Sequence, residues 1–156
     1  MTDWASSAAT RFVEQERMRA ERWAQALQRH QTLVSQGPLL WEGVREALQA
    51  QIQTFNQQVG KQVLIAPTNG DKKLAVYAKT EAGLRAMTAE FDSQMYLITC
   101  CAQPMEGFAD FEERFHLGVN AGFAVSIILP AGTECSAEEA ASHMLNGLMG
   151  WNHAAA

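Results

Sequence analysis

The stretch RFHLGVNAGFAVSIILP, residues 114–130, carries an apolar side chain at every second position. This alternation is typical of a β-strand, whose successive side chains point to opposite faces of a sheet. The apolar set is Phe115, Leu117, Val119, Ala121, Phe123, Val125, Ile127 and Leu129. One unbroken strand would run for about 50 Å, which is longer than strands usually are. We therefore predict a hairpin with the loop Asn120 to Gly122, in which Gly122 is left-handed.

Four further segments before this hairpin also have the strand period. They are residues 62–67, 73–79, 84–91 and 94–102. Asn69-Gly70 favours positive φ and is predicted to turn the first pair of strands. Segment 84–91 also fits a short helix, because its apolar residues recur at steps of three and four. With an acidic loop over 103–113, residues 61–130 are predicted to form an antiparallel sheet of five or six strands.

The first 60 residues have the helical period instead. No glycine or proline interrupts residues 3–34, and a second, amphipathic helix is predicted over residues 38–59. Gly37 can end the first helix, and Pro38 suits the first position of the second. Because the connection is short, we expect an antiparallel helical hairpin over residues 3–60.

The first of these helices is too long for the domain. It would extend about 48 Å, whereas a compact chain of this size is about 40 Å across. It carries an apolar stripe at alternating steps of three and four, like the seam of a coiled coil. The stripe consists of Ala9, Val13, Ala20, Trp23, Leu27 and Val34, and Glu16 and His30 interrupt it. We expect this helix to kink, to project, or to pack on a second subunit.

A last helix is predicted over residues 136–150. Ser136 is a suitable N-cap, and Glu139 at the third helical position completes a capping box. The order of two helices, antiparallel strands and a helix predicts an α+β fold. The length of 156 residues suits a single domain over residues 1–156.

Composition narrows the class of protein. The net charge of −5 argues against nucleic acid as a partner, because binding nucleic acid needs a basic surface. The N-terminus lacks the features of a signal peptide, and no run of about 18 apolar residues predicts a membrane span. Cys100, Cys101 and Cys135 form a poor disulfide framework, so we expect buried thiols in a cytoplasmic protein.

An apolar pocket between helices and sheet is one candidate site. Its lining would be Tyr77, Met87, Tyr96 and Phe123, with His116 as a further candidate ligand-binding residue. Pockets of this kind, mostly apolar with a few polar groups, bind small molecules. A small-molecule-binding domain is therefore one alternative for the function.

A metal- or Cys/His-dependent enzyme is the second alternative. One group, which could meet across the sheet, is His116, Cys100, Cys101 and Glu90; another, in the acidic loop, is Asp110, Glu112 and Glu113. However, the chain has no HExxH motif, no phosphate-binding loop and no GxSxG motif. Lone histidines and charged runs are more often structural or solvated, so we expect no metal, no cofactor and no enzymatic activity.

The candidate interface residues are Trp4, Trp23, Leu27 and Trp151. Trp4 and Trp151 lie near the chain ends, where they either form an interface or fold back onto the sheet. Neither face of the predicted sheet is clearly polar over its middle, so we expect something to cover both faces. We therefore expect a chaperone- or adaptor-like interaction module that forms a homodimer and has a protein partner.

The stretch LGVNAGFAVSIILP, residues 117–130, followed by a capped helix, resembles the type III secretion chaperones, as does the small, acidic, helix-flanked meander as a whole. The resemblance covers the last third of the chain. The two helices predicted before the sheet depart from that pattern. The resemblance therefore implies no residue role and no function for this chain.

Overall fold

The computed structural model describes residues 3–66 and 70–151, and it has the predicted α+β fold. Helix α1 (Trp4–Val59) precedes the sheet, and helix α2 (Ala137–Met149) follows it. The strands are β1 (Leu64–Ile65), β2 (Lys73–Thr80), β3 (Gly83–Asp92), β4 (Leu97–Ala102), β5 (Glu112–Val119), β6 (Val125–Ile128) and β7 (Glu134–Cys135). They form one antiparallel sheet in the order of the sequence. Asn69 of the predicted turn lies outside the described residues.

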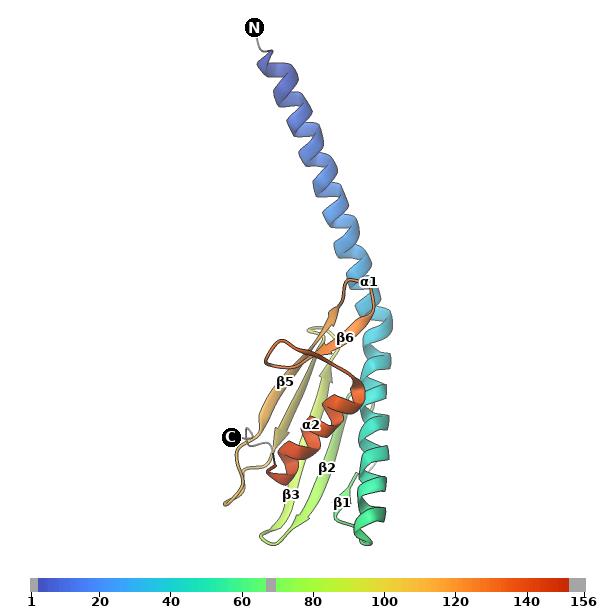
Figure 1. Ribbon diagram of the computed structural model, residues 1–156, viewed down its shortest axis with the longest axis vertical. Helices are drawn as coiled ribbons and strands as arrows, with labels where there is room; N and C mark the ends of the chain where they lie inside the picture. The colour runs from blue at the N-terminus through green and yellow to red at the C-terminus, as the bar shows by residue number, and fades with distance from the viewer. Residues whose placement is uncertain (1–2, 67–69, 152–156) are drawn as a thin grey trace.

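The predicted helical hairpin over residues 3–60 is wrong, because α1 continues through Gly37 and Pro38. Pro38 has no N–H to donate to the carbonyl of Val34, so the helix loses one hydrogen bond there. Residues 35–37, which were predicted to connect the two helices, are themselves helical, so no turn forms between them. The helix therefore stays continuous and bends where it reaches the sheet (Figure 1), as helices do at proline.

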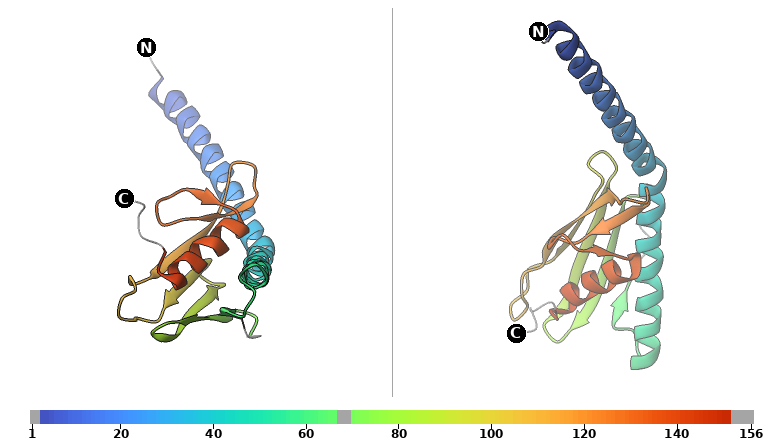
Figure 2. Two further views of the ribbon diagram at one scale, coloured as in Figure 1. Left: turned by 60° about the horizontal axis from the view of Figure 1, so that its bottom comes forward. Right: turned by 45° about the horizontal axis from the view of Figure 1, so that its top comes forward.

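Both helices lie on the same face of the sheet (Figures 1 and 2). The core between them contains Trp41, Val44, Leu48 and Ile52 of α1, Ala140, Met144 and Leu148 of α2, and Val76, Met87, Ile98, Phe115 and Ile127 of the sheet. We call the opposite side the open face, and no described part of the chain covers its middle, where Glu90, Arg114 and His116 are exposed. Within one chain, the expectation that both faces are covered is therefore not met.

Segment 84–91 is a strand, as predicted, and not the alternative short helix. The sheet differs from the prediction in three places, and the first is that β5 begins inside the predicted acidic loop. The sheet does not end at residue 130 as predicted, since β7 pairs with β6 and brings the number of strands to seven. In the β5–β6 hairpin Phe123 has a φ of 56° in place of Gly122, while the Asn120 side chain accepts hydrogen bonds from the backbone N–H of Gly122 and Ala124.

Both ends of α2 are held by hydrogen bonds. At the N-terminus, Ser136 Oγ accepts from the backbone N–H of Glu139, which confirms the predicted cap. At the C-terminus lies Arg85 of β3, the only fully buried charged side chain among the described residues. Its guanidinium donates to the carbonyl oxygens of Gln103 (2.9 Å), Gly147 (3.0 Å), Leu148 (2.9 Å) and Ala109 (3.0 Å). A cation at this position also stabilises the negative end of the helix dipole.

Replacing Arg85 tests how much this cap contributes. Arg85→Met should lower the free energy of unfolding by about 3–5 kcal/mol, because four carbonyl oxygens lose their donor and two of these hydrogen bonds are buried. Urea denaturation measures the change. The matched control is Arg114→Met on the open face of β5, which should change stability by no more than about 0.5 kcal/mol. Equal effects of the two substitutions would contradict the assigned role of Arg85.

Pro38→Ala tests the account of the bend in α1. Alanine restores the N–H for the Val34 carbonyl and Pro38 is exposed, so the free energy of unfolding should rise by about 1–3 kcal/mol. Thermal and urea denaturation report this change, with Leu39→Ala at the neighbouring exposed position as control. A loss of stability in Pro38→Ala would mean that the packing of α1 on the sheet requires the bend.

Candidate functional site

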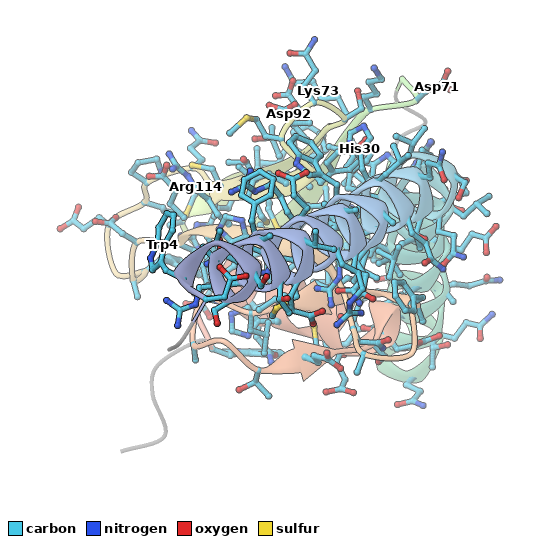
Figure 3. All side chains as sticks on the ribbon, turned by 90° about the horizontal axis from the view of Figure 1, so that it is seen from above. Trp4, His30, Asp71, Lys73, Asp92 and Arg114 are labelled. Carbon is cyan, nitrogen blue, oxygen red and sulfur yellow. The ribbon has the colours of Figure 1, made fainter. Side chains whose placement is uncertain are left out.

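The N-terminal half of α1 stands away from the rest of the chain. Every residue from Asp3 to Gln31 except Ala8 is exposed, and we call residues 4–34 the projecting segment. Figures 1 and 2 show this segment extending beyond the end of the sheet. Figure 3 looks down on it from above, with Trp4 labelled near its free end and His30 labelled farther along, where it meets the sheet. Of the outcomes expected for the first helix, projection and a kink are therefore confirmed.

One side of the projecting segment is apolar and exposed. We call its seam the α1 stripe, consisting of Ala9, Val13, Glu16, Ala20, Trp23, Leu27, His30 and Val34. Val13 is 65% exposed, Trp23 72% and Leu27 57%. A different side carries Arg17, which pairs with Glu14 and with Glu21 at 2.5 Å, as expected of a solvated face. The segment is thus an amphipathic helix whose apolar side is exposed from Ala9 to Leu27 and meets the sheet only at its base, where His30 contacts Tyr96.

The four candidate interface residues fall in two places. Trp23 and Leu27 belong to the α1 stripe, and Trp4, 79% exposed, lies off the stripe near the free end of the helix. Trp151 is 59% exposed and lies at the opposite end of the molecule, beside Phe55 of α1, with a ring-centroid distance of 6.5 Å. Trp4 therefore does not fold back onto the sheet, and Trp151 contacts a helix instead.

Two residues of the predicted pocket contact the base of the projecting segment. The rings of Tyr96 and His30 meet edge to face at 6.1 Å, and Arg29 Cζ lies 5.9 Å from the centre of the Phe123 ring. Tyr96 and Phe123 have φ values of 50° and 56°, a left-handed conformation that costs free energy in residues other than glycine. Both are in turns of the sheet, so these two turns hold α1 where it leaves the domain.

The remaining residues of the predicted pocket lie elsewhere. Met87 is completely buried under the helices, whereas Tyr77 points to the open face, because Met87 pairs with Val76 and side chains alternate along a strand. His116 is also on the open face, beside a shallow recess of about 690 Å³. The recess is lined by Glu112, Glu113, Arg114, His116, Ile128, Leu129, Pro130 and Gly132. The five predicted residues therefore do not line one pocket.

The proposed Cys/His group is not assembled either. Cys100 is buried on the covered face, opposite to the face of His116. Cys101 shares the open face with His116, but His116 pairs with Leu97, four residues or about 13 Å along the strand from Cys101. Among residues 3–66 and 70–151, no cluster of three or more His, Cys, Asp or Glu side chains could hold a metal ion.

The structure contains one His–carboxylate pair that the sequence analysis missed. His143 Nε2 of α2 lies 2.6 Å from Glu113 Oε2 of β5, and the His143 ring packs against Phe111 and Phe115. Cys100 on β4 is the cross-strand neighbour of Glu113, the residue whose carboxylate contacts the His143 imidazole. Burial raises the pKa of the Cys100 thiol, with smaller contributions from the charges of Cys101 and Glu113, which keeps the thiol protonated. A protonated thiol is a poor nucleophile.

The cysteines therefore differ in expected reactivity. Cys100 is buried and Cys101 exposed, which corrects the expectation that all the thiols are buried; Cys135 is half-buried. Under native conditions iodoacetamide should alkylate Cys101 at least about 100-fold faster than Cys100, and both at similar rates in urea. Peptide mass spectrometry measures the two rates. Rapid native alkylation of Cys100 would reveal an activated thiol and would favour the Cys-dependent enzyme.

The comparisons with known proteins return no match: no family model fits the sequence, and no curated protein and no solved structure is significantly similar to it. In particular, they give no link to the type III secretion chaperones. No helix of the described chain combines the length and hydropathy that crossing a membrane requires. Any assignment of function therefore depends on the features of this chain itself, and the α1 stripe is the most distinctive of them.

Proposed function

We propose that this chain is a non-enzymatic interaction module that self-associates through the α1 stripe. The observation that carries the proposal is the exposure of Val13, Trp23 and Leu27 on a projecting helix. Large contiguous apolar surfaces on a protein mark sites of interaction. The spacing of the stripe at alternating steps of three and four is the spacing with which helices pack side by side in coiled coils.

The energetics of an isolated helix support the same proposal. Most helical stability in proteins comes from packing of an amphipathic face, because helix propensity alone gives marginal stability in water. The projecting segment is exposed from Ala9 to Gln28 and contacts the sheet only at its base, through Arg29, His30 and Leu33. A second helix against the stripe would remove Trp23 and Leu27 from water, and fully burying side chains of this size stabilises by about 1.5–3 kcal/mol each.

The two alternative functions have less support. Small-molecule binding was proposed on five residues, and these occupy both faces of the sheet and two turns. The enzyme was proposed on His116 and the strand cysteines, which are separated across the sheet or along it. The recess beside His116 is the feature on which a ligand-binding function would have to be built.

A chaperone- or adaptor-like role and a cytoplasmic location complete the proposal. Self-association through the projecting segment leaves the open face of each sheet available for a protein partner. Its exposed side chains include Glu90, Arg114 and His116, so such a partner would bind through polar contacts. The three free thiols support a reducing compartment.

Leu27→Glu tests the self-association. The wild-type chain should be a dimer at micromolar concentration, and the substitution should raise the dissociation constant at least 100-fold, because it places a charge in the centre of the stripe. Analytical ultracentrifugation measures this constant. The control is Met18→Glu, which adds the same charge on the far side of the same helix and should leave the dimer intact. A monomeric wild-type chain, or equal effects of both substitutions, would contradict the proposal.

A further inference from the structure

The two directions in which a second helix could pack on the α1 stripe are not equivalent. Resting on the proposed self-association, we propose that the occupant of the stripe is a second copy of this chain with its helix antiparallel. In the proposed register Ala20 faces Trp23 of the partner subunit. The positions of Glu16 and Trp23 in the stripe, and a hollow beside Trp23, carry the inference.

The heptad positions of the stripe define the register. Val13, Ala20, Leu27 and Val34 occupy one seam position, and Ala9, Glu16, Trp23 and His30 occupy the other. When two helices run in opposite directions, each residue of the first set faces one of the second. The facing pairs are Val34 with the partner's Ala9, Leu27 with the partner's Glu16, Ala20 with the partner's Trp23, and Val13 with the partner's His30. The largest side chain of the stripe thus faces one of the smallest.

The surface of the projecting segment is hollow where this register needs space. A recess of about 420 Å³ is lined by Trp23, Ala24, Ala26, Leu27 and His30. In the antiparallel register this part of the stripe receives residues 13–20 of the second copy. Ala24 and Ala26 flank the seam, so the partner's helix can approach Trp23 closely, as large residues facing small ones require.

Charge also favours the antiparallel direction. In a parallel dimer Glu16 would face Glu16 of the partner subunit across the seam, and carboxylates that face each other in a partly buried site repel. The antiparallel register places Glu16 against the partner's Leu27 and within one helical turn of the partner's His30. Arg19, 3.6 Å from Glu16 on the same helix, can continue to pair with it in this arrangement.

The shape of the chain agrees with this direction. The globular part lies wholly at one end of the projecting segment (Figures 1 and 2). An antiparallel overlap of residues 9–34 is about 39 Å long and places the two globular parts at opposite ends. A parallel dimer would instead bring both globular parts side by side next to Val34.

Distances between spin labels distinguish the two directions. Labels are placed at Arg11→Cys and, separately, Gln25→Cys, both exposed and on the side of the helix away from the stripe, with Cys101 and Cys135 replaced by serine. In the antiparallel register the two copies of residue 11 are offset along the axis by about 31 Å, and those of residue 25 by about 10 Å. Pulsed electron–electron double resonance should therefore give a label-to-label distance about 15 Å longer for Arg11→Cys than for Gln25→Cys. Equal, short distances for both labels would overturn the proposal in favour of a parallel dimer.

A charge comparison at Leu27 gives an independent readout. In the antiparallel register the substituted side chain faces the partner's Glu16, so Leu27→Glu should weaken the dimer about tenfold more than Leu27→Lys at low ionic strength. In a parallel dimer residue 27 faces its own copy, and the two substitutions should weaken it equally, which would overturn the proposal. A wild-type chain without any dipolar coupling between labels would instead show that the self-association itself is absent, and both proposals would fall together.

Discussion

The buried guanidinium of Arg85 holds together parts of the chain that are far apart in the sequence. It belongs to β3, yet its hydrogen bonds reach the segment between β4 and β5 and the last turn of α2. With α2 fixed in this way, α1 packs beside it, and Gln51 donates a hydrogen bond to the carbonyl of Glu138 at the start of α2. Among the described residues, backbone carbonyl oxygens and no carboxylate lie within hydrogen-bond distance of this cation.

Helix α1 joins two different environments. From Trp41 to Ile52 its apolar side chains are buried, and the same helix carries Trp23 and Leu27 into solvent. In both halves the apolar residues recur at helical steps, so both have the pattern of a helix that packs on something. For the C-terminal half the packing partner is the sheet with α2, while Trp23 and Leu27 of the N-terminal half are exposed.

Local patterns in the sequence predicted most elements of the fold. Alternation predicted the strands, and Ser136 with Glu139 predicted the start of α2, because both signals involve neighbouring residues. The break at Gly37-Pro38 was wrong, since a proline signal does not reveal whether the chain reverses or bends. Arg85 and the carbonyl groups of α2 that it contacts are dozens of residues apart in the sequence, and so are His143 and Glu113. Only the tertiary structure brings the members of each set together. Glu113 nevertheless lies two residues from both Phe111 and Phe115, and this alternation indicates that its side chain is on the covered face.

Because α1 bends at Pro38, a small rotation at the bend produces a large displacement at the free end of the projecting segment. From Val34 to Trp4 the helix extends about 45 Å, so a rotation of about 10° at the bend moves its tip by about 8 Å. The contacts of Tyr96 with His30 and of Phe123 with Arg29 lie close to this bend. Small shifts in these two turns of the sheet would therefore be amplified several-fold at the far end of the helix.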